Sequence, residues 1–234
     1  MPSGKAPTPS VPARSALDQA PKEFLTEGAP FKADVMVVDA GDGPMIVKDF
    51  ARRSWWRRLI GRLEIDRESR AYAYAGPRPW FPTFIGRIDD EALAVEKVDG
   101  VSLRFADDID KQRDNYLGQL RTAMERMTEI GFLHLDARAY RNVLRRPDGR
   151  VVFIDLAGSF WIPPGRPGHR LLKRFIELYY EANIIKWETI LAPGGDPRLG
   201  QPKPPRYVHG IVDLWRARKR LRNRPAAGRP SGRQ

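Results

Sequence analysis

The spacing of apolar residues changes along the chain, from short β-branched runs near the start to a helical period in the middle. Residues 34–38 and 45–50 are β-branched runs separated by a glycine- and proline-containing turn, and this pattern predicts a β-hairpin. A further strand is predicted at 92–98. The cleanest helix is predicted at 111–130, because apolar side chains recur there at helical spacing before a glycine cap. These side chains are Leu117, Leu120, Met124, Met127 and Ile130, and the glycine is Gly131.

The other predicted elements complete an α+β pattern. Good helix formers at 62–75 are followed by Gly76 and Pro77, which end the helix. Later, two short strands enclose a Pro-Asp-Gly turn, and two helices finish the chain. The strands lie at 142–145 and 150–154, and the helices at 169–188 and 207–222. Strands first, then a long helix and a hairpin, predict a two-lobed α+β protein.

Composition suggests where the lobes begin and end. Residues 1–20 are rich in proline, serine and alanine without periodicity, which predicts a flexible leader, and 223–234 predict a flexible tail. Between them we expect a small β-rich lobe with one helix at 21–100. A reduced helical lobe is expected at 101–222.

Several classes of protein are excluded by composition. The 234 residues contain no cysteine, which excludes disulfides and thiolate metal sites, and the three histidines lack metal-ligand spacing. No run approaches the ~20 apolar residues that span a bilayer. The N-terminus lacks the apolar core of a signal peptide, so we expect a cytoplasmic protein.

Positive charge is concentrated in two short runs. The formal net charge is +12, and nearly all of the excess comes from Arg52–Arg62, with five arginines, and Arg216–Arg224, with five arginines and one lysine. Such runs suit a phosphate-rich partner, either an anionic membrane surface or a nucleic acid. The near-neutral remainder and the absence of a recognised nucleic-acid motif argue against specific nucleic-acid binding.

Two tryptophans stand between the arginines of the first run. Trp55 and Trp56 suit a membrane interface, where indole rings lie at headgroup depth and arginines meet lipid phosphate. Burial in the small lobe, or a solvated basic face, are the alternative interpretations. The run at Arg216–Arg224 is interpreted either as a solubilising tail or as a lipid or RNA contact.

Three polar residues follow the long helix in an order that suits phosphoryl transfer. A loop carries Asp136 and Asn142, and the hairpin that follows returns the chain at Asp155. In phosphoryl transfer one carboxylate orients the attacking hydroxyl, which is the role predicted for Asp136. A carboxylate and an amide hold Mg²⁺ against the triphosphate, which are the roles predicted for Asp155 and Asn142.

This segment resembles the catalytic loop and metal-binding aspartate of the protein-kinase superfamily, His-Arg-Asp-x-x-x-x-Asn and Asp-Phe-Gly. The chain has Leu135 at the arginine position, and Leu156-Ala157 follow Asp155. Asn142 lies six residues after Asp136 rather than five, which implies a one-residue bulge within the loop.

The resemblance extends upstream and implies further roles. Lys48 resembles the third-strand lysine that bridges the α- and β-phosphates, and Glu68 the helix glutamate that pairs with it, with Glu64 as the rival. Residues 95–98 resemble the hinge that hydrogen-bonds adenine through its backbone, here at Glu96 and Val98. Arg138 matches the position of a cation on the γ-phosphate, or is a solvated loop arginine. His134 is interpreted as structural. The glycine-rich loop expected at 24–35 contains only Gly28.

The resemblance implies an ATP- and Mg²⁺-dependent kinase with a reduced second lobe. The short chain and the arginine-rich stretch after Lys48 resemble the lipopolysaccharide core (Kdo/heptose) kinases and the atypical, RIO-like bacterial kinases. The expected acceptor is a sugar hydroxyl of a lipopolysaccharide precursor, with the enzyme peripheral on the cytosolic face of the inner membrane. A protein serine or threonine is the alternative acceptor, and a pseudokinase without turnover is the alternative class.

Overall fold

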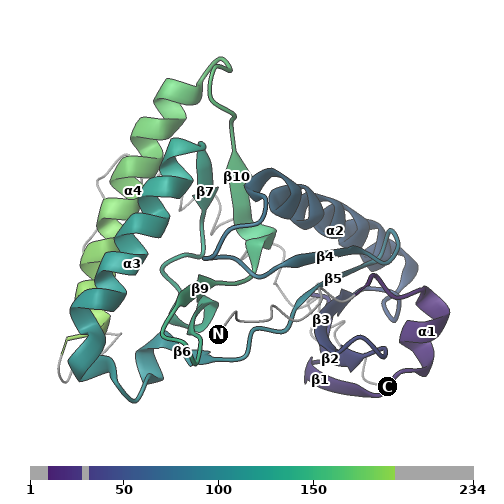
Figure 1. The fold of residues 1–234 in the computed structure, drawn as a ribbon. Coiled ribbons are helices and arrows are strands. Elements are labelled where there is room, and N and C mark those ends of the chain that lie inside the picture. Colours follow the sequence, from purple (N-terminus) through teal and green to yellow (C-terminus); the bar gives the residue numbers. More distant parts are fainter. Residues whose placement is uncertain (1–9, 28–31, 193–234) are drawn as a thin grey trace, which may run out of the picture. The chain divides into compact units, whose positions relative to one another are not determined.

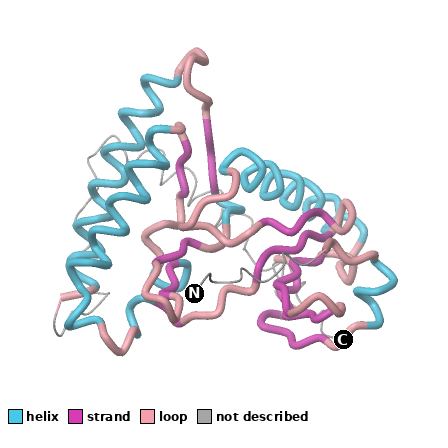
Figure 2. The backbone as a smooth tube through the Cα atoms, viewed as in Figure 1, coloured by secondary structure: helices cyan, strands magenta, loops and turns pink. Residues whose placement is uncertain are grey.

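The computed structural model describes residues 10–27 and 32–192 and contains both helices and antiparallel sheets (Figures 1 and 2). The α+β class predicted from the sequence is confirmed. The elements of the sheet lobe are α1 (Arg14–Gln19), β1 (Lys22–Thr26), β2 (Asp34–Asp39), β3 (Pro44–Asp49), α2 (Trp55–Ala75), β4 (Phe84–Arg87) and β5 (Ala92–Glu96). The predicted helix at 207–222, the tail and the Arg216–Arg224 run lie outside the described residues.

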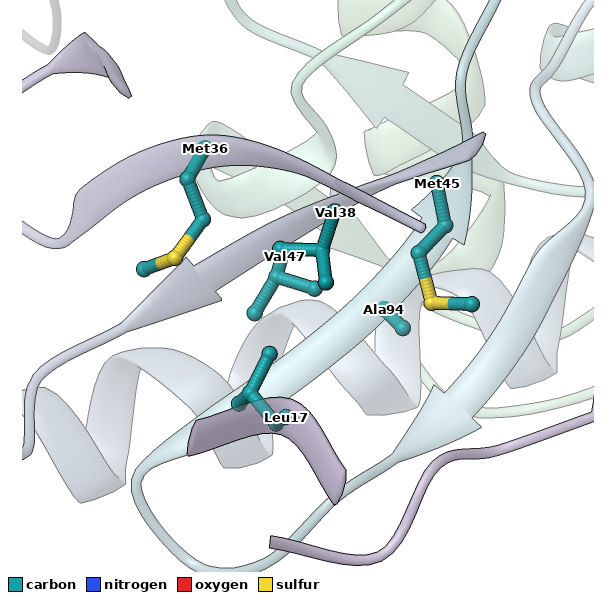
Figure 3. Packing of buried hydrophobic residues seen from close by; sticks show 6 residues of the cluster. All are labelled: Leu17, Met36, Val38, Met45, Val47 and Ala94. Atoms are coloured by element: carbon teal, nitrogen blue, oxygen red, sulfur yellow. The ribbon is translucent and has the colours of Figure 1, made fainter. Parts of the chain in front are cut away.

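The five strands of this lobe form one antiparallel sheet in the order β1-β2-β3-β5-β4. The β2–β3 hairpin predicted from the sequence is present, with Met36 opposite Val47. Because side chains alternate along a strand, one face of β2, β3 and β5 presents a continuous apolar surface. Its buried residues are Met36, Val38, Met45, Val47 and Ala94, and Leu17 of α1 covers them (Figure 3).

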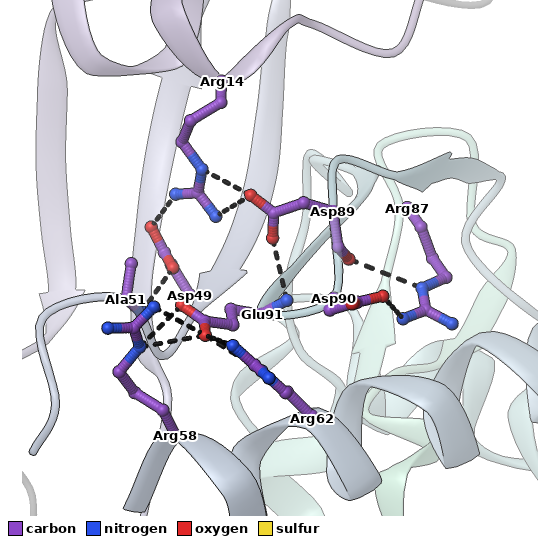
Figure 4. A network of polar contacts seen from close by, with 9 residues as sticks. All are labelled: Arg14, Asp49, Ala51, Arg58, Arg62, Arg87, Asp89, Asp90 and Glu91. Atoms are coloured by element: carbon purple, nitrogen blue, oxygen red, sulfur yellow. Dashed lines mark hydrogen bonds and ion pairs between the residues drawn. The ribbon is translucent and has the colours of Figure 1, made fainter. Parts of the chain in front are cut away.

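The predicted flexible leader is wrong for its last residues. Leu17 is buried in the sheet core, and Arg14 binds both Asp49 at 2.5 Å and Asp89 at 2.6 Å (Figure 4). A single leucine within a Pro/Ser/Ala-rich segment gives no period to recognise, so the composition of residues 1–20 concealed α1.

Helix α2 begins seven residues before its predicted start at residue 62. The same polar network holds its first turns, because Arg58 and Arg62 both bind Glu91 in the turn before β5 (Figure 4). Gly61 allows the helix to approach β3 closely: a Cβ there would lie 2.3 Å from Cγ of Phe50. The early turns of α2 were missed because they are apolar on their outer face as well, which conceals the helical period.

The helical lobe is built on two long helices that lie side by side, α3 (Ile109–Glu129) and α4 (His169–Ile190) (Figure 1). The helix predicted at 111–130 is α3. Its smaller elements are β6 (Val101–Ser102), η1 (Leu103–Phe105), β7 (Phe132–His134), η2 (Tyr140–Asn142), β8 (Val143–Arg145), β9 (Val151–Phe153), η3 (Leu156–Gly158) and β10 (Ser159–Trp161). Strands β6, β8 and β9 form one sheet, and β7 pairs with β10. No helix among the described residues is long and apolar enough to cross a bilayer.

Aromatic rings pack α2 against the helical lobe. Tyr74 stacks on Trp161 at 5.6 Å between ring centroids and on Phe132 at 6.3 Å. The Tyr74 hydroxyl also donates to the Ile130 carbonyl, at the end of α3. Helix α2 therefore contacts both the sheet and the β7–β10 pair of the helical lobe.

Candidate active site

Lys48, Glu68 and Asp155 meet although they are far apart in the sequence. Val47 faces the apolar core, so Lys48 projects from the opposite face of β3. Its Nζ lies 2.7 Å from Oε1 and 3.0 Å from Oε2 of Glu68 on α2, and 2.7 Å from Oδ1 of Asp155. One ammonium group is thus shared by carboxylates from two different elements.

The partner of Lys48 on α2 is Glu68, as predicted, and not Glu64. The Glu68 side chain is 1% exposed. Burial and the nearby charge of Asp155 raise the pKa of Glu68 to about 7, although Lys48 acts in the opposite direction. For Lys48, burial lowers the pKa, but the two carboxylates more than offset this and raise it above its ordinary value. When Glu68 is ionised, two carboxylates around one ammonium leave this cluster with excess negative charge.

The raised pKa of Glu68 predicts a pH-dependent contribution to stability. A carboxyl group with a higher pKa in the folded state contributes stability below its unfolded pKa and loses it as the pH rises through its folded pKa. Between about pH 4.5 and 7, the unfolding free energy of the wild type should therefore fall relative to that of Glu68→Gln. The expected change is on the order of 3 kcal/mol. Urea unfolding of both proteins at matched pH measures it, and a difference that stays constant with pH would contradict it.

Asp155 has an unusual backbone conformation. Its φ of 67° and ψ of 74° lie in the left-handed region, and it is the one non-glycine residue with positive φ among the described residues. Such strain is kept where the surrounding structure fixes a functional side chain. The Asp155 side chain is 45% exposed, and the charge of Lys48 lowers its pKa. It therefore stays ionised, with one oxygen on Lys48 and solvent access for a ligand.

The strand pairs of the helical lobe place Asn142 and Asp136 near the same point. The β8–β9 hairpin brings the residue before Asp155 onto Asn142: the Ile154 N–H donates to the Asn142 carbonyl at 2.9 Å. In the β7–β10 pair, Ser159 lies opposite His134, so Gly158 meets the loop that follows β7. A Cβ at Gly158 would lie 3.1 Å from Oδ2 of Asp136. Asp136 and Asn142 thus lie at strand ends next to the 155–158 turn.

Side chains of α4 hold the backbone of the loop that bears Asp136. The Tyr180 hydroxyl accepts from the His134 N–H at 2.9 Å and donates to the Phe132 carbonyl at 3.1 Å. Three further α4 side chains donate to consecutive parts of the loop. They are Tyr179 to the Leu135 carbonyl, Trp187 to the Ala137 carbonyl and Lys186 to the Arg138 carbonyl. Sequence reasoning missed all four, because tyrosine, tryptophan and lysine on an amphipathic helix carry no motif.

Removing one of these bonds should destabilise the fold measurably. Trp187 Nε1 donates to the Ala137 carbonyl at 3.1 Å, and both residues are buried. Trp187→Phe leaves that carbonyl without its partner, which should cost about 1–3 kcal/mol of unfolding free energy. Urea unfolding measures it, with Trp55→Phe as the control, since Trp55 is exposed and should change stability by less than about 0.5 kcal/mol. Equal effects of the two substitutions would contradict this account.

Other predicted residues have the following places. Arg138 lies on the loop, and no carboxylate among the described residues is within ion-pair distance of its guanidinium. The Glu96 side chain binds Arg146 at 2.7 Å and accepts from the Thr83 N–H at 2.8 Å, so it contributes to the junction after β5. Val98 follows β5, which ends at Glu96 and not at residue 98 as predicted.

His134 is fully buried, which lowers its pKa and agrees with a structural role. The glycine-poor segment at 24–35 includes residues 28–31, which are outside the described residues.

The donors at these strand ends suit a Mg²⁺ ion that is shared with substrate phosphates and water. They do not suit a metal ion that is held by protein ligands alone. Within residues 10–27 and 32–192, no three carboxylate, imidazole or thiol groups are arranged to hold a metal ion. Mg²⁺ in phosphoryl-transfer sites is bound through one or two carboxylates together with substrate phosphates and water. Asp155 offers such a carboxylate and Asn142 an amide oxygen, next to a cluster with excess negative charge.

Together, the antiparallel sheet with Lys48, the helix with Glu68 and the hairpin ending at Asp155 bring charged side chains from three separate elements of the α+β fold to one site. No family model and no curated protein matches the chain. Solved structures do match, among them the Rio2 kinase–ADP/Mg²⁺-phosphoaspartate complex from Chaetomium thermophilum. The two chains share 14% sequence identity with a TM-score of 0.46, and the match covers 89% of this chain and 73% of that one.

Proposed function

We propose that this protein is an ATP- and Mg²⁺-dependent phosphotransferase with an alcohol group as acceptor. The observation that carries the proposal is the shared position of Lys48, which binds Glu68 and Asp155 at 2.7 Å each. Phosphoryl transfer depends on such a fixed arrangement of charges, because positioning and electrostatic stabilisation supply most of the rate.

Each residue of the site has a definite task in this mechanism. Lys48, held by Glu68, would bind the phosphates, and Arg138 would meet the γ-phosphate. Asp155 and Asn142 would hold Mg²⁺, which neutralises phosphate charge when bound. Asp136 would orient the acceptor hydroxyl and take up its proton. The hydroxyl oxygen bonds to the γ-phosphorus, the bond to the bridging oxygen breaks, and ADP leaves. The backbone of Glu96 and Val98 would hydrogen-bond the adenine.

Exposed aromatic rings beside the loop support a sugar as the acceptor. Tyr140 lies between Asp136 and Asn142, and its ring packs edge-on against that of Phe105 at 6.4 Å. Arg104 lies over both rings, at 5.2 and 5.4 Å from their centroids. Phe105 and Tyr140 are 65% and 40% exposed. Exposed aromatic faces beside a cation offer a stacking surface for a sugar ring with an acidic substituent.

We therefore favour a sugar hydroxyl of a lipopolysaccharide-core precursor, reached at the cytosolic face of a membrane. A protein serine or threonine, as in atypical RIO-like kinases, is the second candidate, and Asp136 would serve it in the same way. A pseudokinase is the remaining alternative. The missing glycine-rich loop and the departures at Leu135 and at Leu156-Ala157 favour it, whereas retention of all five polar site residues opposes it.

Calorimetry of ATP binding, with and without Mg²⁺, tests the proposal, followed by ATP turnover in the same samples. We expect Mg²⁺-dependent binding and slow turnover that candidate sugar acceptors accelerate. Tyr140→Ala should then raise KM for a sugar acceptor while leaving ATP affinity unchanged. Binding without turnover, even with acceptors present, would indicate a pseudokinase. No nucleotide binding would overturn the proposal.

A further inference from the structure

Helix α2 presents a row of large apolar side chains to solvent along its first half. Trp55 and Leu63 are 72% and 73% exposed, and Leu59 and Ile60 between them are 50% and 36% exposed. Trp56 continues the same surface. These five residues are called the α2 stripe below. Monomeric proteins rarely expose contiguous apolar surface of this kind, and where it occurs it marks an interaction site.

The stripe occupies one side of the helix, and its side chains do not pack into the protein core. At 100° per residue, its five positions fall within an arc of about 140°. The side chains that face the protein, Ile65, Glu68 and Tyr72, are buried and point in the opposite direction. Gly61 fixes this orientation by allowing the helix to lie directly on Phe50. Turning the stripe inward would therefore break the Lys48–Glu68 pair.

Arginines border the stripe on both sides. Arg58 and Arg62 lie along one edge, and although both bind Glu91, they remain 41% and 45% exposed. Arg57 lies on the other edge, with its guanidinium 4.9 Å from the centroid of the Trp56 ring. Arg52, just before the helix, is exposed and binds Glu27. Arg58 and Arg62 share the single carboxylate of Glu91, so the stripe has a positive border despite these ion pairs.

We infer that the first half of α2 docks on the surface of an anionic lipid bilayer. Indole and leucine side chains would enter the boundary between headgroups and acyl chains, and the bordering arginines would meet lipid phosphates. Both parts of this surface match a bilayer. Its apolar interior suits the α2 stripe, and its negatively charged headgroups suit the arginine border. The inference does not depend on the proposed chemistry, although α2 also carries Glu68.

Vesicle co-sedimentation of the full-length protein tests the inference. Vesicles of phosphatidylcholine alone should bind weakly, and vesicles that also contain phosphatidylglycerol should bind strongly. The double substitution Trp55→Gln/Leu63→Gln should weaken this binding by at least about tenfold, because two large apolar side chains no longer leave water. The matched control is Leu171→Gln, which changes an equally exposed leucine on α4 and should have no effect. Urea unfolding of each variant confirms that the fold is retained.

Two further variants separate this inference from its alternatives. Replacing the arginines of Arg216–Arg224 by glutamine should leave stripe-dependent binding in place. If that variant abolishes binding while the double variant does not, the second basic run is the membrane contact and the inference is wrong. Asp155→Ala should bind vesicles like the wild type, so a failure of the proposed catalysis leaves the inference untouched. A vesicle-free dimer in light scattering, dissociated by the double substitution, would instead assign the stripe to self-association and overturn it.

Discussion

Replacing Asp155 by asparagine should lower ATP turnover on the order of 10³-fold and remove most of the Mg²⁺ dependence of ATP binding. The substitution keeps the shape of the side chain and removes its charge. Its backbone has a φ of 67°, which asparagine tolerates better than most residues, so the fold should persist. Loss of activity would then report on charge and not on strain.

The matched control for this substitution is Asp148→Asn. Asp148 lies in the turn of the β8–β9 hairpin, where it binds Arg150 at 2.6 Å and is half exposed. Its loss should leave turnover and ATP affinity close to those of the wild type, because exposed ion pairs contribute little. Equal loss in the two variants, or full activity of Asp155→Asn, would exclude Asp155 as a metal ligand.

Replacing Lys48 by methionine should destabilise the protein by about 3–5 kcal/mol, because it leaves the buried Glu68 carboxylate without its partner. The double variant Lys48→Met/Glu68→Gln removes both charges and should recover most of that stability. Neither variant should recover ATP affinity, since the ammonium that meets the phosphates is missing from both. Stability and function are thereby separated at a single ion pair.

Chemical and thermal unfolding measure the stability, and calorimetry measures ATP affinity. Lys173→Met, at an exposed lysine on α4, serves as the control and should change neither quantity. If the single and double variants are equally stable, Glu68 is not held as a buried charge, and loss of its ion pair is not what destabilises the single variant.

The elements that could be predicted are those whose residues form a recognisable pattern in the sequence. The β2–β3 hairpin and α3 have a clear period, and both were predicted within a few residues of their observed bounds. The pairing of Lys48 with Glu68 was predicted from the resemblance to the protein-kinase superfamily, in which a helix glutamate pairs with the third-strand lysine. Strands such as β6, β7 and β10 have only two or three residues, too few to show any alternation.

Other features depend on tertiary contacts that no local pattern records. The unusual backbone at Asp155 occurs where the β8–β9 hairpin ends and the side chain pairs with Lys48 on another strand. Gly158 has no special φ, and only the proximity of Asp136 makes its lack of a side chain matter. The start of α2 was missed because apolar side chains also lie on its outer face. The apolar residues there therefore do not follow the period of a helix that is buried on one face only.

The four side chains that α4 places on the loop after β7 have a consequence for local unfolding. Surface loops ordinarily open with little free energy, so their amides exchange rapidly with solvent. Here, opening the loop requires release of Tyr179, Tyr180, Lys186 and Trp187 from its backbone. Amides from His134 to Arg138 should therefore exchange at rates set by the opening of α4, so that the loop and this helix form one cooperative unit.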